Sequence, residues 1–429
     1  MRVLIVGGGG REHALAWKIR QSPLVQVLFA APGNPGIARD ATCVQIGVDA
    51  QRDLVAFARR ERVDLAVVGP EAPLVAGLAD RLAEGALTVF GPGARAAAIE
   101  GSKVFAKDLM RRHHIPTAQF STFDDPDRAR RYCRELGAPL VVKADGLAAG
   151  KGAIVCRTLG EAEAAIAECM ERRGFGAAGA RVVVEELMIG DEVSFFVLSN
   201  GHDAIALAAA QDHKTIFDGD RGPNTGGMGA CSPVGVFDEP LEKRVMETIV
   251  RPTLAALASE GAPYRGVLYV GLMLTTGGPK VVEFNCRFGD PECQVLLTRA
   301  PGDLVPWLLA AALGATWPPA ISWPHNASVC VNLASSGYPG AYTIGLPIRG
   351  VDAAQARPGV RVFHSGTADR EGRLVTAGGR VLGVTAVAET LEGAIAAAYA
   401  AVGDISFDGM HYRTDIGRRA AQPREGRGP

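Results

Sequence analysis

Paired cysteines, long apolar runs and an excess of charge of either sign are all missing from this sequence of 429 residues. The eight cysteines stand singly with no C-x-x-C pair, which argues against a disulfide framework or a structural zinc site and fits a reducing cytosol. No apolar run is long enough to span a membrane, and the run after Met1 meets glycines too early for a signal peptide. A net charge of -1 gives no sign of a nucleic-acid or anionic-membrane partner. We therefore expect a cytoplasmic protein.

The chain has enough apolar material for more than one core. Hydrophobic residues make up 48% of the sequence, and the mean hydropathy is +0.12. Single cores stop growing at about 250–300 residues. Two or three compact domains are expected.

The first third of the chain alternates apolar, strand-like runs with turn-rich segments. Strands are predicted at Val3–Val6, Val25–Ala30, Leu65–Val68 and Thr88–Phe90, and the apolar spacing of Glu12–Ile19 predicts a helix. This alternation is typical of an open α/β domain with a parallel sheet, which binds ligands at the carboxyl ends of its strands.

Four glycines, Gly7 to Gly10, form the turn after the first predicted strand. Gly7 and Gly9 fit the dinucleotide pattern G-x-G-x-x-G, but Glu12 stands at the third glycine position, which disfavours a nicotinamide cofactor. A turn that faces the phosphate of a smaller ligand and a turn with no ligand both stay open. His13 is interpreted as a packing residue.

The middle of the chain contains a second glycine-rich loop between two predicted strands, Leu140–Lys143 and Ala153–Cys156. The loop spans residues 144–152, and its backbone N–H groups and Lys151 could lie over phosphates. It is not a Walker A loop, because a strand follows it and Gly152 replaces the Ser/Thr. A mobile hairpin tip is the alternative to nucleotide binding.

A helix is predicted just before this region, over Ser102–His113, with Ser102 as its N-cap. Lys103 and Lys107 are one helical turn apart on it. Another strand, Arg181–Leu187, ends in two acidic residues that either mark its exit to solvent or accept hydrogen bonds from adenine and ribose. The segment 211–230, which follows a strand at Val193–Leu198, is predicted to be a long polar functional loop.

The most informative stretch is the run from Val281 to Glu292, in which apolar residues lead into Glu-x-Asn-x-Arg. On a strand, Glu283, Asn285 and Arg287 point to the same face. A hard divalent metal prefers the carboxylate and amide oxygens, and a phosphate or carboxylate prefers the guanidinium. Cys286 should face away and serve as packing. The pattern indicates a phosphoryl-transfer site, although a solvated strand face is the alternative.

At this point the motifs resemble the phosphoribosylamine–glycine ligase (glycinamide ribonucleotide synthetase) family of the ATP-grasp group. The resemblance covers nearly the whole chain and rests on these stretches, in order: Gly9–Ala14, Val68–Leu74, Glu100–Lys103, Lys143–Gly152, Gly222–Gly229, Glu283–Glu292, Phe363–Thr367 and Gly378–Leu382. The sequence departs from the family at Gly8, where Asn is usual. The strand run Tyr269–Met273 also lacks the further acidic metal ligand of many ATP-grasp enzymes.

The resemblance implies an α/β ligase of three domains. An N-terminal open parallel-sheet domain would span residues 1–101, and a two-sheet ATP-grasp region would span 102–327 with a mobile lid at about 124–198. A small C-terminal α/β domain would span 328–420, and the tail 421–429 would be disordered. The resemblance and the composition together imply a monomer without nucleic-acid or membrane partners.

The resemblance also implies a set of site residues for three substrates, namely ATP, glycine and 5-phosphoribosylamine. Those for ATP are Lys103, Lys143, Asp145, Gly146, Gly150, Lys151, Gly152, Glu185, Glu186, Leu187, Met188 and Glu192. Those for glycine and phosphoribosylamine are Gly9, Gly10, Glu71, Asp212, Asn224, Gly227 and Arg287, with Glu71 expected at the ribose hydroxyls and Asp212 at the glycine ammonium. Catalytic roles fall to Arg287, Lys143 and Asp212, and Glu283 and Asn285 would hold Mg²⁺ or Mn²⁺.

The implied reaction makes glycinamide ribonucleotide, ADP and phosphate through a glycyl phosphate intermediate, a step of de novo purine biosynthesis. Three alternatives remain open at this point. They are an ATP-grasp ligase that carboxylates or formylates a related purine precursor, a nicotinamide-dependent dehydrogenase, and a non-catalytic nucleotide-binding subunit. The last has no need of Lys143, Glu283 and Asn285, which are all present.

Overall fold

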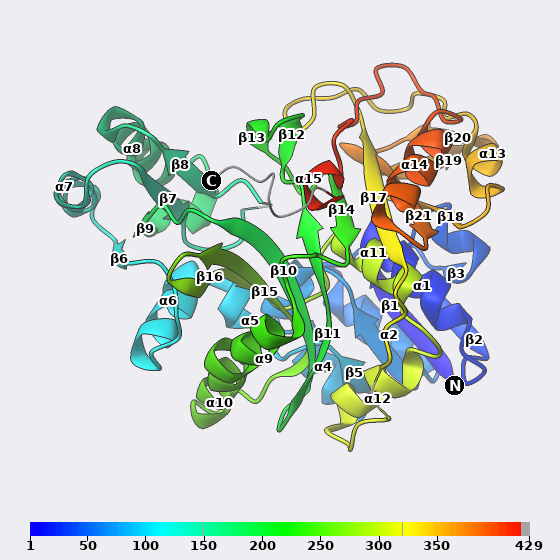
Figure 1. The fold of residues 1–429 in the computed structure, drawn as a ribbon. Helices are drawn as coiled ribbons and strands as arrows, with labels where there is room; N and C mark the ends of the chain where they lie inside the picture. The colour runs from blue at the N-terminus through cyan, green and yellow to red at the C-terminus, as the bar shows by residue number, and fades with distance from the viewer. Residues whose placement is uncertain (149, 320, 422–429) are drawn as a thin grey trace.

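The structure is a computed structural model that describes residues 1–148, 150–319 and 321–421. Within these residues the chain builds three main sheets, each with its own helices, and two separate hairpins (Figure 1). The tail that was expected to be disordered, 421–429, lies outside the described residues apart from Ala421.

The N-terminal domain is an open, all-parallel sheet of five strands, as the alternating pattern predicted. In spatial order its strands are β3 (Thr42–Cys43), β2 (Val27–Pro32), β1 (Arg2–Gly7), β4 (Leu65–Val68) and β5 (Thr88–Phe90). Its helices are α1 (Gly10–Arg20), α2 (Gln51–Arg60), α3 (Glu71–Val75), α4 (Leu78–Ala83) and α5 (Ala94–Gly101). A short 3₁₀ turn, Ile37–Arg39, precedes β3. The predicted bounds of β4 and β5 are confirmed, whereas β2 begins two residues later than predicted.

An eight-stranded antiparallel sheet forms the centre of the molecule. In spatial order its strands are β16 (Gly278–Asn285), β15 (Arg265–Thr275), β10 (Asp191–Asn200), β11 (Ala204–Asp212), β14 (Gly229–Ser232), β17 (Ala327–Ala334), β21 (Arg380–Ala388) and β18 (Val360–His364). The last three strands belong to the expected C-terminal domain, so the sheet runs without a break from the ATP-grasp region into that domain.

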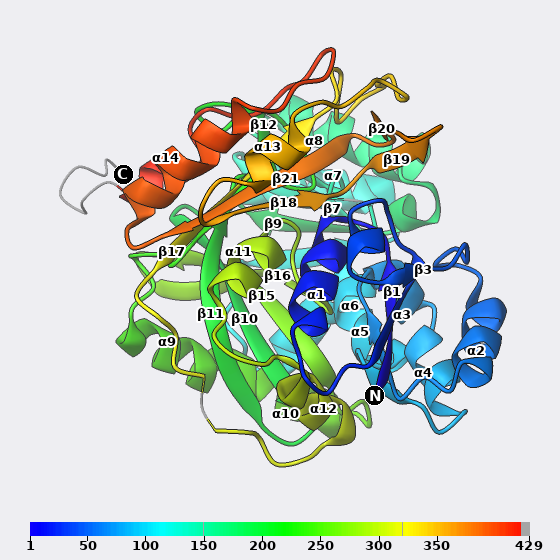
Figure 2. The same ribbon diagram turned by 90° about the vertical axis from the view of Figure 1, so that its right-hand side faces the viewer.

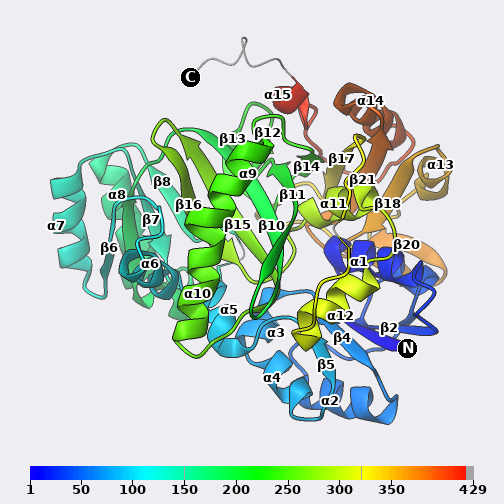
Figure 3. The same ribbon diagram turned by 60° about the horizontal axis from the view of Figure 1, so that its bottom comes forward.

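Helices cover this sheet and connect it to the N-terminal domain. They are α9 (Glu239–Val245), α10 (Arg251–Ser259), α11 (Glu292–Arg299), α12 (Val305–Leu313), α13 (Val351–Gln355), α14 (Leu391–Val402) and α15 (Arg418–Ala421). A π-helical segment, Met246–Val250, joins α9 to α10, and Figure 3 shows this helical stack in front of β10 and β15. Figure 2 shows α1 and α11 side by side below β18 and β21, where the domains meet.

A four-stranded antiparallel sheet forms a separate lobe, which projects at the left of Figure 1. In spatial order it contains β6 (Phe120–Phe123), β9 (Val182–Glu186), β7 (Leu140–Ala144) and β8 (Ala153–Cys156). The lobe helices are α7 (Pro126–Leu136) and α8 (Leu159–Ile166), followed by a π-helical segment (Ala167–Glu171) and a 3₁₀ turn (Gly176–Ala180). The expected lid range of 124–198 reaches into β10, which is a strand of the large sheet. The lobe itself begins at β6 and ends at β9.

Helix α6 (Lys103–Arg112) connects the N-terminal domain to this lobe, and the predicted cap is confirmed. The Ser102 hydroxyl accepts a hydrogen bond from Phe105 N at 3.0 Å. The helices α7, α8, α9 and α14 begin in the same way, at Asp125, Thr158, Asp238 and Thr390. These oxygens satisfy N–H groups that the first helical turn leaves unpaired.

The segment 211–230 was expected to be an irregular loop, and that expectation is wrong. It contains the end of β11, the hairpin β12 (Thr215–Phe217) with β13 (Arg221–Asn224), and β14. The hairpin is not predicted from the sequence, because β13 consists of Arg-Gly-Pro-Asn and contains no β-branched residue of the kind that is typical of strands. A second hairpin, β19 (Thr367–Arg370) with β20 (Arg373–Thr376), lies in the C-terminal domain.

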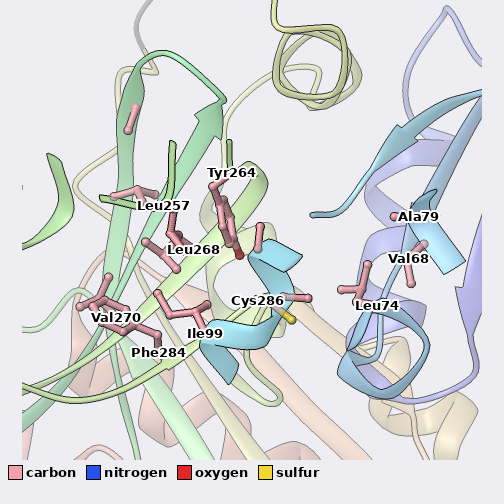
Figure 4. Close-up of a cluster of buried hydrophobic side chains, with 14 of the residues drawn as sticks. Val68, Leu74, Ala79, Ile99, Leu257, Tyr264, Leu268, Val270, Phe284 and Cys286 are labelled. Atoms are coloured by element: carbon pink, nitrogen blue, oxygen red, sulfur yellow. The ribbon is translucent and has the colours of Figure 1, made fainter. Parts of the chain in front are cut away.

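The largest core crosses from the N-terminal domain into the large sheet. Figure 4 shows Ile99 of α5 beside Phe284 of β16 and Val270 of β15, while Leu74 and Val68 continue the cluster on the N-terminal side. This shared core fixes β16, which carries the expected metal ligands, against the N-terminal domain.

Polar contacts fix the C-terminal domain to the N-terminal domain. Asn34, after β2, donates from Nδ2 to the carbonyls of Gly8 (2.9 Å) and His364 (2.8 Å), and its Oδ1 accepts from Ile37 N (2.9 Å). His13 accepts the backbone N–H of His364 and packs against Phe363, which confirms it as a packing residue. Burial lowers the pKa of His13 to about 3, so it stays neutral and can accept.

Replacing Asn34 with alanine should destabilise the protein by about 2–4 kcal/mol, because three buried backbone groups lose their partner at once. Urea unfolding followed by circular dichroism measures this loss. The control is Gln26→Ala, a change at an exposed position just before β2, whose free energy of unfolding should stay within about 0.5 kcal/mol of the parent. Equal stability of Asn34→Ala and the parent would contradict the role of this contact.

Candidate active site

The face of β16 that carries Glu283 and Asn285 is confirmed by the structure. Phe284 and Cys286 are buried in the core, 2% and 1% exposed, whereas Glu283, Asn285 and Arg287 alternate with them. Cys286 therefore packs away from the site, as expected (Figure 4). The two oxygen donors for a metal point to the face opposite the core.

A β-bulge in β16 adds a contact that the sequence did not predict. The pairing with β15 shifts between Gly271 and Leu272, so that Val282 is the extra residue. The Val282 carbonyl accepts a hydrogen bond from Lys143 Nζ at 3.0 Å. The bulge thus connects the large sheet to a lysine of the four-stranded sheet.

Several cations surround the Glu283 carboxylate. Lys214 Nζ lies 3.7 Å from Glu283 Oε1, and Lys103 Nζ donates to the Gly146 carbonyl at 2.9 Å. Burial alone would raise the pKa of Glu283, but Lys214, Lys143, Lys103 and Arg287 together lower it to about 2. Glu283 is therefore ionised at neutral pH, within a strongly positive surrounding.

Glu185 lies between two lysines and is almost completely buried. Its Oε1 is 2.5 Å from Lys143 Nζ and its Oε2 is 2.5 Å from Lys107 Nζ, and the side chains of all three are at most 5% exposed. The expected role as an acceptor for adenine or ribose stays a prediction, and in this structure both oxygens face lysines. Glu185 supplies the negative charge that allows Lys143 to remain buried.

The other acidic residues of this region lie nearer the surface. Glu186 accepts from Lys280 at 2.9 Å and from Gln119 N at 3.0 Å, and Glu192 pairs with Lys214. Leu187 and Met188 lie between β9 and β10 and are partly buried. The segment between β9 and β10 connects the four-stranded sheet to the large sheet. Leu187 and Met188, which were expected to contact ATP, lie in this connection.

Asp145 begins the glycine-rich loop and is held by protein donors. Its Oδ1 accepts from the Ser102 hydroxyl (2.8 Å) and Val104 N (3.1 Å), and its Oδ2 accepts from Arg181 (2.6 Å). A carboxylate at the N-terminus of α6 also interacts favourably with the helix dipole. Asp145 therefore fixes the base of the loop to α6.

The loop beyond Asp145 reaches across to other parts of the chain. Gly146 and Gly150 have φ of +109° and +75°, which other residues rarely adopt. Lys151 donates to the Pro339 carbonyl of the C-terminal domain at 2.9 Å. A Cβ at Gly152 would lie 2.7 Å from Ala148 Cβ, so the turn needs glycine there. The loop thus spans from α6 to the C-terminal domain.

Asn224 lies at the end of β13, in the wall of a cavity of about 1110 Å³ that also contains Lys151. The cavity separates the edge strand β8 from the β12–β13 hairpin and from residues 335–340. Asn224 and Lys151 of the glycine-rich loop therefore line the same cavity.

Arg287 is largely occupied by neighbouring protein groups. It donates to Glu71 at 3.1 Å, to Glu100 at 2.9 Å and to its neighbour's carbonyl, that of Phe288, at 3.2 Å. Burial alone would raise the pKa of Glu71, but Arg287 and Arg11 lower it to about 2. These bonds leave few N–H donors of Arg287 for a substrate. The hydrogen bond from Arg287 fixes the orientation of the Glu71 side chain.

Asp212 ends β11 and is the least satisfied carboxylate of the site. Its Oδ1 is buried and has no hydrogen-bond partner. Burial and the nearby carboxylate of Glu292 raise the pKa of Asp212 well above its usual value. At Gly227, which has φ of +107°, a Cβ would lie 2.8 Å from this Oδ1. The carboxylate is thus packed closely against Gly227, and its unpartnered oxygen could accept a hydrogen bond from a small cationic group.

The first glycine turn is closed by Glu12. The Glu12 carboxylate accepts from Gly9 N at 2.7 Å, and a Cβ at Gly7 or Gly69 would lie within 2.4 Å of its side chain. Gly10 faces Ser365 and Gln294, since a Cβ there would lie 2.6 and 2.7 Å from their side chains. The Gly9 N–H group is therefore used, and the carboxylate fills the place where a dinucleotide would approach the turn.

Several charged residues of the site were missed, or were not assigned a role, by reasoning from the sequence. They are Lys107, Lys214, Glu100, Asp290, Glu292, Arg11 and Arg380. The spacing of Lys103 and Lys107 signalled one of them, and Arg380 lies inside a motif that carried the family resemblance. No local pattern could indicate the pairing of Lys107 with Glu185, because the two residues are 78 positions apart in the sequence.

The metal donors are few. Among the described residues no group of three or more His, Cys, Asp or Glu side chains is arranged to hold a metal ion. Glu283 and Asn285 supply one carboxylate and one amide oxygen, which fits a divalent ion that takes its other ligands from phosphate and water.

No helix among the described residues is long and apolar enough to cross a membrane.

Comparison with known families matches the chain in three consecutive parts. Residues 1–100 match the phosphoribosylglycinamide synthetase N domain, residues 101–293 its ATP-grasp (A) domain and residues 328–419 its C domain. The phosphoribosylamine–glycine ligase of Rhizobium meliloti is 53% identical over 420 residues, covering 98% of this chain and 99% of that protein. The ligase of the same name from Escherichia coli O157:H7 is 50% identical over 427 residues, with the same coverage.

Solved structures agree with this at the level of the fold. The crystal structure of phosphoribosylamine–glycine ligase from Thermotoga maritima has a TM-score of 0.86 at 34% identity, covering 97% of this chain and all of that one. The biotin carboxylase domain of the Hydrogenobacter thermophilus 2-oxoglutarate carboxylase has a TM-score of 0.72 at 19% identity, covering 96% of this chain and 91% of that one, and shows the shared fold alone.

Replacing Glu185 with glutamine should destabilise the protein by about 3–5 kcal/mol, because two buried lysines lose their counter-charge. Urea unfolding measures the change. Glu163→Gln serves as the control, since Glu163 pairs with Arg134 on the surface at 3.1 Å and should cost at most about 0.5 kcal/mol. A stability loss at Glu185 no larger than at Glu163 would contradict the role given to the buried pair.

Proposed function

The chain belongs to the phosphoribosylglycinamide synthetase family of the ATP-grasp group, and from this premise we propose how it joins glycine to 5-phosphoribosylamine. The activity is that of a phosphoribosylamine–glycine ligase, which uses ATP and releases ADP and phosphate in purine biosynthesis. The observation that carries the proposal is the group of lysines, Lys103, Lys143 and Lys214, gathered around the carboxylate of Glu283 between two sheets.

ATP lies between the four-stranded sheet and the large sheet in this proposal. Lys103, Lys143 and the glycine-rich loop neutralise its phosphates, because a transferring phosphoryl group needs positive charge on its equatorial oxygens. Glu283 and Asn285 would hold the divalent metal, Mg²⁺ or Mn²⁺, which would supply positive charge to stabilise the transferring phosphoryl group. Glu185 keeps Lys143 charged in this buried place.

Two bonds are made and two are broken in the reaction. A carboxylate oxygen of glycine attacks the γ-phosphorus, ADP leaves, and glycyl phosphate is formed. The amine nitrogen of 5-phosphoribosylamine then attacks the acyl carbon and loses a proton, and phosphate leaves. No covalent bond to the enzyme is needed, which agrees with Cys286 being buried in the core.

The four-stranded lobe, together with the glycine-rich loop, is the lid in this proposal. The support is the loop's reach to Pro339 through Lys151 and the freedom that Gly146 and Gly150 give its backbone. A lid that opens must release the Lys151 contact, and one that closes excludes water from glycyl phosphate, which water would hydrolyse.

Asp212 receives the ammonium group of glycine, since its buried oxygen lacks a donor. The N-terminal turn with Gly9 and Gly10, and Glu71, which Arg287 orients, receive the phosphoribosylamine. Gly227 leaves room beside Asp212, and Asn224 takes part from the hairpin side. All eight cysteines are free, which supports a reducing cytoplasm, and we place the enzyme there as a monomer.

The other readings of the sequence fit less well. A nicotinamide dehydrogenase would need the space that Glu12 fills at Gly7 and Gly69. A non-catalytic subunit would have no use for a buried metal-facing carboxylate among lysines. A carboxylating or formylating ligase shares the fold, as the N5-carboxyaminoimidazole ribonucleotide synthetase of Thermus thermophilus illustrates, with a TM-score of 0.64 at 21% identity.

The substrate requirement is the direct test. ADP release should be strong only when ATP, a divalent metal, glycine and 5-phosphoribosylamine are all present, with glycinamide ribonucleotide as the product. Glycine without the amine should support little turnover, because the acyl phosphate then has no acceptor. The unstable amine is generated in the assay from ribose 5-phosphate and ammonia. Turnover with bicarbonate or formate in place of glycine would replace this proposal with the carboxylating or formylating one.

Replacing Glu283 with glutamine should lower kcat by about 100-fold or more, because the metal would lose the negative charge of its proposed carboxylate ligand. A coupled ADP-release assay measures kcat, and circular dichroism checks the fold. Glu163→Gln, on the surface of α8, is the matched control and should keep the parental kcat. A folded Glu283→Gln protein with near-parental kcat would remove Glu283 from the metal site.

A further inference from the structure

Side chains of the C-terminal domain hold a two-glycine segment that belongs to the ATP-grasp region. The Gly226 N–H group donates to the Tyr338 hydroxyl at 3.0 Å, and Asn332 Nδ2 donates to the Gly227 carbonyl at 2.8 Å. Arg380 Nη1 donates to the carbonyls of Gly226 at 2.5 Å and of Gly227 at 3.3 Å. Three residues from beyond position 328 thus position one peptide segment near the active site.

Arg380 also holds a second segment, at the start of α11. Its Nη1 donates to the Asp290 carbonyl at 2.6 Å, and its Nη2 lies 3.4 Å from the Asp290 carboxylate. The same carboxylate accepts from Gln294 at 2.8 Å and, weakly, from Arg11 N at 3.4 Å. One guanidinium therefore connects the two-glycine segment to the segment just before α11. Through Asp290 it is also connected to the first turn of α1.

The two segments that Arg380 joins meet at Gly227, which lies next to the Asp212 carboxylate. A Cβ at Gly227 would lie 2.8 Å from Asp212 Oδ1, 2.6 Å from Pro291 Cδ and 3.2 Å from the Asp290 carbonyl. Gly227 is therefore packed closely against both the unpartnered Asp212 oxygen and the Asp290–Pro291 backbone, where a side chain would not fit. The surroundings of this oxygen depend on the group that fixes these two backbones.

We propose that Arg380 is the positioning residue that fixes the backbone around the glycine subsite beside Asp212. The inference rests on the proposed function, which places the glycine ammonium at Asp212. Arg380 acts through the backbones of Gly227 and Asp290 and does not itself touch glycine. A planar guanidinium suits this task, because it donates in fixed directions to several acceptors at once, which a lysine ammonium does not.

A purely structural role of Arg380 would have a different signature. It would lower stability and affect the use of every substrate alike. A positioning role near Asp212 affects glycine first, because Arg380 contacts both segments beside Asp212 directly, whereas it reaches the glycine-rich loop indirectly, through Gly226, whose Cα would lie 3.9 Å from a Cβ at Gly150. The ratio of the effects on the KM values for glycine and ATP therefore separates the two roles.

The experiment compares Arg380→Lys and Arg380→Gln with the parent at saturating phosphoribosylamine. The KM for glycine should rise by about 10-fold or more in Arg380→Gln, since charge-assisted hydrogen bonds to two segments are lost, and less in Arg380→Lys. The KM for ATP should stay within about 2-fold of the parent. Arg357→Gln is the control, because Arg357 pairs with Asp404 on the surface of the same domain and should change neither constant.

A milder variant keeps the test decisive if the Arg380 variants do not fold. Tyr338→Phe removes only the hydroxyl that accepts from Gly226 N, and it should raise the KM for glycine by about 2- to 5-fold with that for ATP unchanged. Equal changes for glycine and ATP, or no change for glycine, in the folded variants would overturn the inference. Absence of glycine-dependent turnover in the parent would instead overturn the proposed function, so the two failures are distinguishable.

Discussion

The position of Lys143 is the constraint on which the rest of the site depends. Its ammonium group is shared between Glu185 of its own sheet and the Val282 carbonyl of the large sheet. A lysine can remain charged at 4% exposure only when carboxylates and carbonyls replace the water that it has lost. The bulge in β16, which presents the Val282 carbonyl, and the buried Glu185 meet this need. Lys143 thereby connects the four-stranded sheet to the large sheet.

The same need for compensation recurs throughout the site. Glu71 and Glu100 accept from Arg287, Asp145 accepts from Arg181, and Asp290 accepts from Gln294 while facing Arg380. Asp212 differs, because one of its oxygens is left without a donor. Among the described residues a few other buried oxygens near the site, such as those of Gln294, Asn332 and Ser365, also lack a partner, but they belong to neutral side chains. That contrast, and no single distance, is the reason to place a substrate group at Asp212.

Reasoning from the sequence predicted the elements with strong periodicity and missed those held by distant contacts. The strands β4, β5 and β8 and the cap of α6 follow from local pattern, because buried runs and a serine before a helix leave few alternatives. The β12–β13 hairpin could not be predicted, since the strand Arg221–Asn224 has no strand-forming residues and is held by its partner. The position of Glu185 could not be predicted for a related reason. Two acidic residues at a strand end look alike in sequence, and only contacts with distant residues such as Lys107 distinguish the buried Glu185 from the half-buried Glu186.

The continuity of the large sheet has a consequence for how the polypeptide acquires its structure during synthesis. Strand β14 pairs with β17 through Gly229–Val331 and its neighbours, and β17 pairs with β21 at residues 380–388. Until β17 has left the ribosome, the backbone groups of β14 on that side have no partner strand, and β17 in turn has an open edge until β21 follows. The N-terminal parallel sheet contains only residues before position 91 and can close early. The central sheet, by contrast, is finished only when the nascent chain is nearly complete, so the catalytic centre is among the last parts of the molecule to form.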